Sequence, residues 1–215
     1  MSSEYLNIAT TDAVRAIRAQ MSCDEMWAST EGTGGTDALT AREVSFIGER
    51  DSFYLATVSE TGWPYVQHRG GPPGFLKVID ANTLAFADYL GNRQYISAGN
   101  VSRNDRAALI IVDYPRRRRL KLYVRIETHP VDESPELAAR VIDAGYRGRP
   151  AMVQTLHVVA YDWNCPQHIT PRYTESEIAR MSQPLREQLA ALEKENRELK
   201  AIISKGGTEP PTDAV

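Results

Sequence analysis

Two basic side chains flank a rigid loop in the segment VQHRGGPPGFLKVID, residues 66–80. Arg69 precedes the pair Gly70 and Gly71, and Lys77 follows the loop. Glycines let a ligand approach the backbone closely, and prolines stiffen the turn. Arg69 and Lys77 would therefore place fixed positive charge on both sides of an anionic ligand. A plain rigid turn explains the same composition, and these residues alone leave both interpretations open.

A second candidate site follows the strand that is expected to end at Asp88. Asn92, Arg93 and Gln94 combine two side-chain amides with one guanidinium and lead into a short helix. Such groups at a strand end suit an anionic phosphate. The sequence contains neither a Gly-Lys-Ser/Thr loop nor GxGxxG, so the common nucleotide fingerprints are absent. The expected ligand is a phosphate held by arginine and side-chain amides.

A third candidate lies in YDWNCPQHITPRYT, residues 161–174, after the last expected strand. It carries a dense polar and aromatic set: Trp163, Asn164, Gln167, His168 and Arg172. Cys165 and His168 have the spacing of half a zinc site, but no second pair follows, so no metal is expected. A nucleophilic Cys165 assisted by His168 is a further alternative that spacing alone does not decide.

The composition bounds the functions that these groups can serve. The chain has 215 residues, 42% hydrophobic and 25% charged, with a net charge of -3, which suits a globular protein with one sizeable core or two small ones. A pI of about 5.9 argues against nucleic-acid binding. No apolar run reaches the ~20 residues of a membrane helix, and no secretory signal is visible. Two widely separated cysteines favour a cytoplasmic protein with free thiols.

The pattern of apolar residues predicts a β-rich middle between helices. A helix is expected over residues 10–28, followed by a Gly/Thr-rich loop, and Thr40 and Glu43 form a capping box that opens a helix to Ile47. Another helix is expected over residues 135–144. The run at 107–114 is continuously apolar and suggests burial on both faces, whereas 120–128 alternates. Short strands with tight turns favour an antiparallel barrel; they are expected at 52–59, 63–69, 75–79, 83–88, 107–114, 120–128 and 152–163.

The C-terminal segment has a heptad pattern. Alternating steps of four and three residues place apolar side chains at d and a positions: Leu185, Leu189, Leu192, Leu199 and Ile203. Asn196 falls at a, where one buried Asn specifies a parallel two-stranded register, and Glu195 and Lys200 have the g-to-e′ spacing of an interchain ion pair. We therefore expect a dimeric parallel coiled coil over residues 174–204, with a single helix packed on the barrel as the alternative. Residues 205–215 are expected to be disordered.

Three stretches together resemble the pyridoxamine 5'-phosphate oxidase-like family of FMN-binding split barrels: RDSFYLATVSETGWPYVQHRGGPPGFLKVID, LAFADYLGNRQYISAGNVSRNDRAALIIVDY and RRRRLKLYVRIE. The resemblance covers about residues 40–172, and DWNCPQHITPR resembles the C-terminal signature of one bacterial branch. It implies a mainly β domain at 39–173, a six-stranded antiparallel split barrel with flanking helices. It also implies a homodimer with two FMN sites at the subunit interface. Residues 1–38 would be an N-terminal addition of unassigned role.

The resemblance also implies roles for individual residues. The phosphate would lie at Asn92, Arg93 and Gln94, and Arg119 would lie near the isoalloxazine ring. Arg119 or Lys121 would stabilise the reduced flavin, and His168 would donate a proton or orient the substrate. The C-terminal residues would close the site, often from the other subunit. The implied cofactor-binding set is His68, Arg69, Gly70, Gly71, Phe75, Lys77, Asp88, Asn92, Arg93, Gln94, Asn100, Arg119, Lys121, Gln167 and Arg172.

The expected function is an FMN-dependent oxidoreductase that acts on a small organic molecule, with a nicotinamide cofactor as a candidate electron donor. The GGPPG loop lengthens a segment that is compact in pyridoxamine phosphate oxidase itself, so oxidation of vitamin B6 is not the expected activity. Two alternatives remain open. One is a non-catalytic flavin-binding or sensing dimer, and the other is a split barrel that uses F420 or haem in place of FMN.

Overall fold

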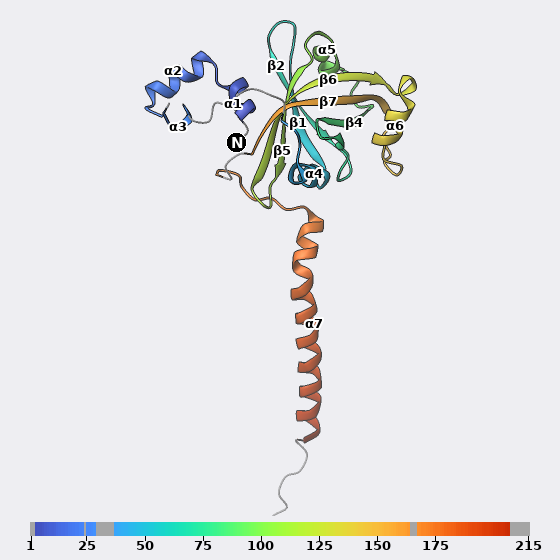
Figure 1. Ribbon diagram of the computed structural model, residues 1–215. Helices are drawn as coiled ribbons and strands as arrows, with labels where there is room; N and C mark the ends of the chain where they lie inside the picture. Colours follow the sequence, from blue (N-terminus) through green and yellow to red (C-terminus); the bar gives the residue numbers. More distant parts are fainter. Residues whose placement is uncertain (1–2, 24, 29–36, 164–166, 207–215) are drawn as a thin grey trace, which may run out of the picture. The chain divides into compact units, whose positions relative to one another are not determined.

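The computed structural model describes residues 3–23, 25–28, 37–163 and 167–206 (Figure 1). The chain divides into two compact units, Met1–Thr170 and Pro171–Val215, and each is described by itself. Most of the Gly/Thr-rich loop, Cys165 and residues 207–215 of the expected disordered tail lie outside the described residues.

One antiparallel sheet of seven strands forms the first unit, in the order β2-β1-β5-β6-β7-β4-β3. The mainly β, antiparallel architecture agrees with the expectation, but the resemblance implied six strands. The sheet is not closed, because β2 and β3 are its two edges and do not pair with each other. The strands are β1 (Ser52–Val58), β2 (Pro64–Gly70), β3 (Lys77–Asp80), β4 (Thr83–Tyr89), β5 (Arg106–Asp113), β6 (Arg118–Pro130) and β7 (Pro150–Trp163).

Short helices flank the sheet, and the second unit contains one long helix, α7 (Glu175–Gly206). The single helix expected over residues 10–28 is wrong: the chain turns at Ser22, whose φ of 53° is left-handed and does not continue a right-handed helix. The helix expected to end at residue 144 ends at Val141. None of the described helices combines the length and apolarity of a membrane span. The short helices are α1 (Ser3–Ala9), α2 (Asp12–Gln20), α3 (Glu25–Ala28), α4 (Ala41–Gly48), α5 (Ile96–Arg103), η1 (Val131–Glu133) and α6 (Pro135–Val141).

The two faces of the sheet differ in burial because successive side chains of a strand point in opposite directions. On β6, Leu120 and Leu122 are fully buried, while Lys121 and Tyr123 lie on the opposite, outer face. The alternation expected for this strand is confirmed. The expectation that β5 is buried on both faces is wrong, since its outward residues Ala108, Ile110 and Val112 are only half-buried.

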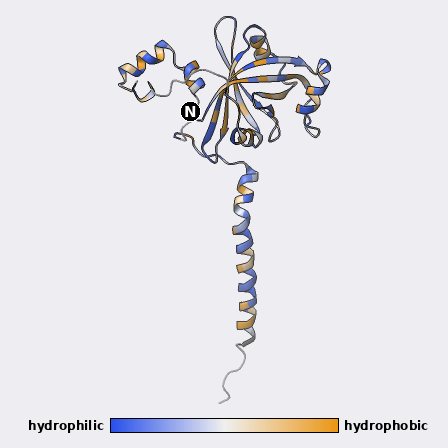
Figure 2. Cartoon of the chain, viewed as in Figure 1, coloured by the Kyte–Doolittle hydropathy of each residue, from blue (hydrophilic) through white to orange (hydrophobic). Residues whose placement is uncertain are grey.

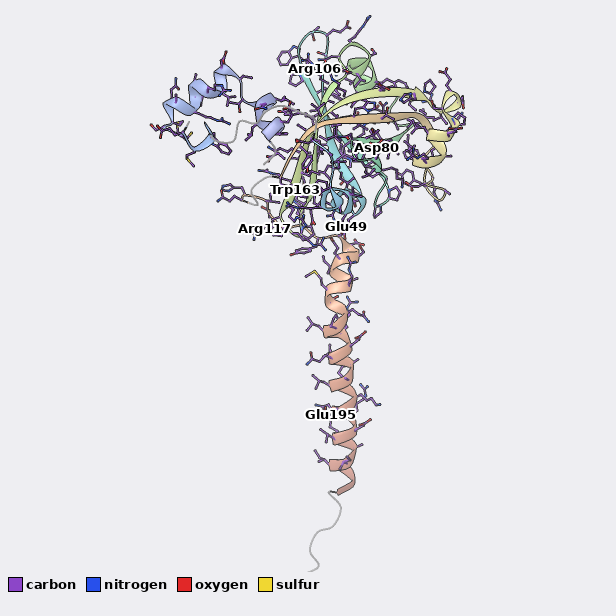
Figure 3. The ribbon with its side chains drawn as sticks, in the orientation of Figure 1. Glu49, Asp80, Arg106, Arg117, Trp163 and Glu195 are labelled. Carbon is purple, nitrogen blue, oxygen red and sulfur yellow. The ribbon has the colours of Figure 1, made fainter. Side chains whose placement is uncertain are left out.

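Glu43 ties α4 to the end of β7. The expected capping box with Thr40 is confirmed, and the Thr40 N–H donates to Glu43 Oε2 at 3.0 Å. The indole N–H of Trp163 donates to Glu43 Oε1 at 2.6 Å (Trp163 is labelled in Figure 3). Burial raises the pKa of Glu43, but the hydrogen bonds from Thr40 and Trp163 outweigh it, and the net pKa is lowered.

Replacing Glu43 with Gln removes one of two acceptor oxygens, and an unpaired buried donor costs about 1–3 kcal/mol in unfolding free energy. Because the folded pKa is lowered, the stabilisation by Glu43 is complete above the unfolded pKa of ~4.3 and is lost as the pH falls through the folded value. The difference in free energy of unfolding between wild type and Glu43→Gln should therefore become smaller as the pH is lowered. Urea unfolding across pH measures it, with Glu60→Gln, a 69% exposed side chain, as control. A gap that widens in acid would contradict the assignment.

Candidate functional site

A cavity of about 180 Å³ lies where β2 and β4 meet the start of α5. It brings together five of the residues singled out in the sequence: Arg69, Asp88, Asn92, Arg93 and Gln94. In the sheet, β2 and β4 are separated by four other strands, so only the curl of the open sheet places them at one cavity. The cavity therefore lies at the seam where the barrel is not closed.

An ion pair crosses this seam. Arg69 Nη1 donates to Asp88 Oδ1 at 2.6 Å, and the two side chains are 15% and 16% exposed. The Arg69 Nε atom is buried and has no hydrogen-bond partner among the described residues. Burial raises the pKa of the Asp88 carboxyl, although Arg69 and Gln154 oppose that shift. Asp88 thus orients the Arg69 guanidinium while leaving part of its donor capacity unused.

The backbone between Gly91 and α5 forms a cradle. Arg93 and Tyr95 have left-handed φ angles of 59° and 52°. Non-glycine residues adopt this conformation at a cost of roughly 1–2 kcal/mol each, and such residues concentrate at ligand clamps. Asn92 Oδ1 accepts from the Gln94 N–H at 3.1 Å and fixes the turn. The loop is thereby shaped before any ligand binds.

The start of α5 lines the cavity and has no side-chain cap among the described residues. Tyr95 stands at the N-cap and makes no side-chain hydrogen bond to the first turn. Ser97, in that turn, instead donates to Gln67 Oε1 at 3.1 Å. The first amides of a helix need an acceptor and carry the positive end of the helix dipole, which favours an anion. Together with Arg69 and Arg93, these amides fit a phosphate monoester.

A second cavity adjoins the first and shares Arg69, Asp88 and Tyr89 with it. Three further predicted residues, His68, Gly70 and Phe75, line this second cavity. Phe75 is 3% exposed and stacks on Phe53 with ring centres 5.5 Å apart, so it is mainly a core residue.

Gly71 serves the packing of Phe75. A Cβ at Gly71 would lie 2.7 Å from Phe75 Cβ, closer than carbon atoms pack. The Gly71 N–H donates to the Asp51 carbonyl at 2.9 Å and is not free for a ligand. The close approach expected from the glycine pair therefore occurs, but to a phenylalanine ring.

Comparison with known proteins identifies the fold family. The sequence profile named pyridoxamine 5'-phosphate oxidase matches residues 39–159, more than half of the chain. This chain belongs to the pyridoxamine 5'-phosphate oxidase family. Among curated proteins, none matches it.

Several solved structures are similar to this chain. A candidate pyridoxamine 5'-phosphate oxidase of Lactobacillus delbrueckii has 25% identity and a TM-score of 0.46, covering 60% of this chain and 96% of its own. HupZ of Group A Streptococcus has 16% identity and a TM-score of 0.45, covering 63% and 99%. An F420 reductase has 19% identity and a TM-score of 0.39, covering 55% and 94%.

Lys77 lies away from the first cavity of this family member. Its ammonium group pairs with Asp143 Oδ1 at 2.6 Å, with side chains 27% and 29% exposed. Asp143 follows α6, so this pair joins β3 to a segment that the sequence did not connect with it. The expectation that Arg69 and Lys77 lie on both sides of one ligand is therefore not met within a single chain, because Lys77 does not line the first cavity.

The two basic residues of β6 lie on the outer face. Lys121 pairs with Asp162 at 3.2 Å, and its ammonium lies 4.5 Å from the centre of the Tyr5 ring. Lys121 and Tyr5 line a third cavity of about 210 Å³ with Val66 and Tyr123. Arg119 lies on the same face of β6, two residues away, and its buried Nε has no partner among the described residues.

The C-terminal candidates are exposed. Gln167 and His168 follow β7, and neither lines the first or second cavity. His168 has a left-handed φ of 62°. Arg172 belongs to the C-terminal unit. Their expected role in closing the site of another subunit stays a prediction.

The sequence analysis missed several residues that line the first cavity: Tyr65, Gln67, Tyr89, Tyr95, Ser97 and Met152. The period of two along β2 could have indicated Tyr65 and Gln67, which share the face of Arg69. Ser97 stands in the first turn of the helix that the sequence placed after Gln94. Nothing local indicated Met152, which comes from β7.

Asn100 holds α5 against the sheet. Its amide donates to Thr57 Oγ1 at 3.0 Å, and the two residues are 8% and 1% exposed. Asn100→Ala should lower the free energy of unfolding by about 1–3 kcal/mol, because a buried hydroxyl loses its donor. Urea unfolding tests this, with Ser102→Ala at the exposed end of α5 as control. An unchanged unfolding free energy would instead favour a role confined to ligand binding.

Proposed function

We propose that this protein is an FMN-binding oxidoreductase that acts on a small organic molecule. The observation that carries the proposal is the meeting of Arg69, Arg93 and the uncapped start of α5 at one cavity. A phosphate monoester on a mononucleotide is an anion of the right size and charge for such a site. Membership of the pyridoxamine 5'-phosphate oxidase family supports a flavin as the rest of the ligand.

Each residue of the cavity has a separate task in this proposal. The first amides of α5 and the Arg93 guanidinium bind the phosphate. Arg69, held by Asp88, contributes a second cation with a fixed direction. Asn92 and Gln94 keep the loop in its shape through their mutual hydrogen bonds.

The edge strand β2 supports a ligand larger than phosphate. Tyr65 and Gln67 line the first cavity, whereas Val66, between them, lines the third cavity on the outer face. Neighbouring residues of the edge strand β2 therefore line two different cavities: the proposed phosphate site, and the third cavity with its tyrosines and Lys121. When bound, FMN would supply hydride or one-electron chemistry, and a cation such as Lys121 or Arg119 would favour the reduced, anionic ring.

The proposal includes a homodimer, with the flavin at the subunit interface and a nicotinamide cofactor as electron donor. In that assembly, His168 of one subunit donates a proton or orients the substrate bound by the other. A non-catalytic flavin dimer would bind FMN equally well but would show no turnover with any donor and acceptor pair. F420 or haem in place of FMN would be recognised by the mass and absorbance of the released cofactor.

Replacing Arg93 with Ala tests the phosphate site. Loss of a charge-assisted hydrogen bond costs about 1.5–3 kcal/mol, so the Kd for FMN should rise about 10- to 100-fold. The binding isotherm follows quenching of flavin fluorescence by the protein. Arg103→Ala is the matched control, because Arg103 is the last residue of α5, the helix that Arg93 precedes, and is 68% exposed. Unchanged FMN affinity in Arg93→Ala would remove the phosphate assignment.

Replacing His168 with Ala tests the proton-transfer role. Positioned acid–base groups contribute on the order of 10²–10⁴ in rate, so kcat should fall by about 10² while the Kd for FMN stays unchanged. Steady-state reduction of the bound flavin by a nicotinamide cofactor, followed by reoxidation with a candidate acceptor, provides the rate. His157→Ala, a half-exposed histidine of β7, serves as the control. Equal rates for wild type and His168→Ala would exclude this histidine.

A further inference from the structure

The apolar stripe of α7 is exposed along its whole length. Of the α7 side chains described between residues 175 and 204, none is buried. Figure 2 shows apolar segments that recur along the helix. Exposure ranges from 51% at Leu199 to 73% at Ile203 for the set Ile178, Leu185, Leu189, Leu192, Leu199 and Ile203. An exposed apolar surface of this extent marks an interaction site.

The structure lengthens the heptad beyond the stripe visible from Leu185 onward. The helix already includes Ile178 and Ser182, which fall at d and a of one further heptad toward the N-terminus. The helix also continues through Pro184, which falls at c. Proline distorts a helix locally by removing a donor and crowding the preceding turn. At c it stands away from the d/a stripe, so the stripe runs from Ile178 to Ile203, with Ser182 and Asn196 as its two polar members.

We propose that α7 pairs with α7 of a second copy of this chain as a parallel, in-register, two-stranded coiled coil. Asn196 at a decides the register, because only that alignment brings two Asn196 amides together to hydrogen-bond in an apolar seam. Leu at three of the four d positions and the buried Asn196 at a favour two strands over three or four.

The charges of α7 complement this arrangement. Within the helix, Gln183 donates to Glu187 at 2.7 Å and Lys194 lies 3.9 Å from Glu198. These four residues occupy b, c and f positions, on the outside of the proposed coil. Glu195 (Figure 3) and Lys200, at g and e, form no ion pair within the described part of the chain. In a parallel coil, Glu195 of one helix faces Lys200 of the other, and these two charges become partners.

Disulfide trapping in the full-length protein tests the pairing directly. In a Cys23→Ser, Cys165→Ser background, Leu199→Cys places one thiol at a d position. Disulfides need Cα atoms within about 4.4–6.8 Å, a spacing that facing d positions of a parallel coil provide. Under mild oxidation we expect Leu199→Cys to form covalent dimer at least about tenfold faster than Lys194→Cys. Pairing of the helices raises the effective thiol concentration only at the d and a positions of the coil. Lys194 is at f, on the outside.

The choice of residue 199 distinguishes the proposal from other arrangements. In an antiparallel pair, Leu199 would face the region of Ser182 and could not form a disulfide with its own copy. A dimer held through the barrel alone would not favour residue 199 over residue 194. Equal rates at the two positions would therefore overturn the proposal. Leu192→Asp, added to Leu199→Cys, should abolish the fast cross-link while the unfolding transition of the barrel unit stays unchanged. Persistence of the cross-link would equally overturn it.

Discussion

The ion pair between Arg69 and Asp88 links the fold to the site. Arg69 is on the edge strand β2 and Asp88 is on β4, with four strands between them in the sheet order, yet their side chains meet at 2.6 Å. An antiparallel sheet twists and curls, and here it curls far enough to bring β2 close to β4 without pairing the two strands. The seam that remains is too open for backbone hydrogen bonds and is lined by side chains. Because the sheet does not close into a barrel, a cavity remains between β2 and β4, and Arg69 and Arg93 line it.

Asp88 has two opposing effects on the seam. Its carboxylate holds the Arg69 guanidinium at a fixed angle, but burial makes the charged form costly, which is why its pKa is raised. A phosphate near Arg69 would add a second negative charge close to that carboxylate. The nearby Arg93 and the first amides of α5 then matter, because two cations and a helix dipole can accommodate two anions where one cation could not.

The sequence predicts those features of the fold and the site that depend on residues close together in the chain. The Thr40–Glu43 capping box and the alternation of β6 are local patterns, and the structure confirms both. Glu43 also accepts a hydrogen bond from Trp163, 120 positions away, and no local sequence pattern predicts that bond. The same holds for Lys77, whose partner Asp143 lies 66 positions away, and for Asn100, which binds Thr57 rather than facing the cavity. The local sequence groups the residues of one loop, such as Asn92, Arg93 and Gln94, whereas Arg69 and Asp88, which meet across the curl of the sheet, were placed in one site only through the family resemblance.

The left-handed turn before α5 is strained, and the surrounding fold stabilises it. Arg93 and Tyr95 carry backbone strain of roughly 1–2 kcal/mol each, and the bonds between Asn92 and Gln94 are exposed and compensate little. The helix behind them is anchored much more firmly. Ser97 binds Gln67 on β2 and Asn100 binds Thr57 on β1, so α5 is fixed on two adjacent strands. With the helix held in place, the loop must reach it from the end of β4 in few residues, and the left-handed conformations follow from that short connection. The strained turn is therefore held by the bonds that fix α5 to β1 and β2, and the start of α5 keeps its place in the cavity wall whether or not an anion is present.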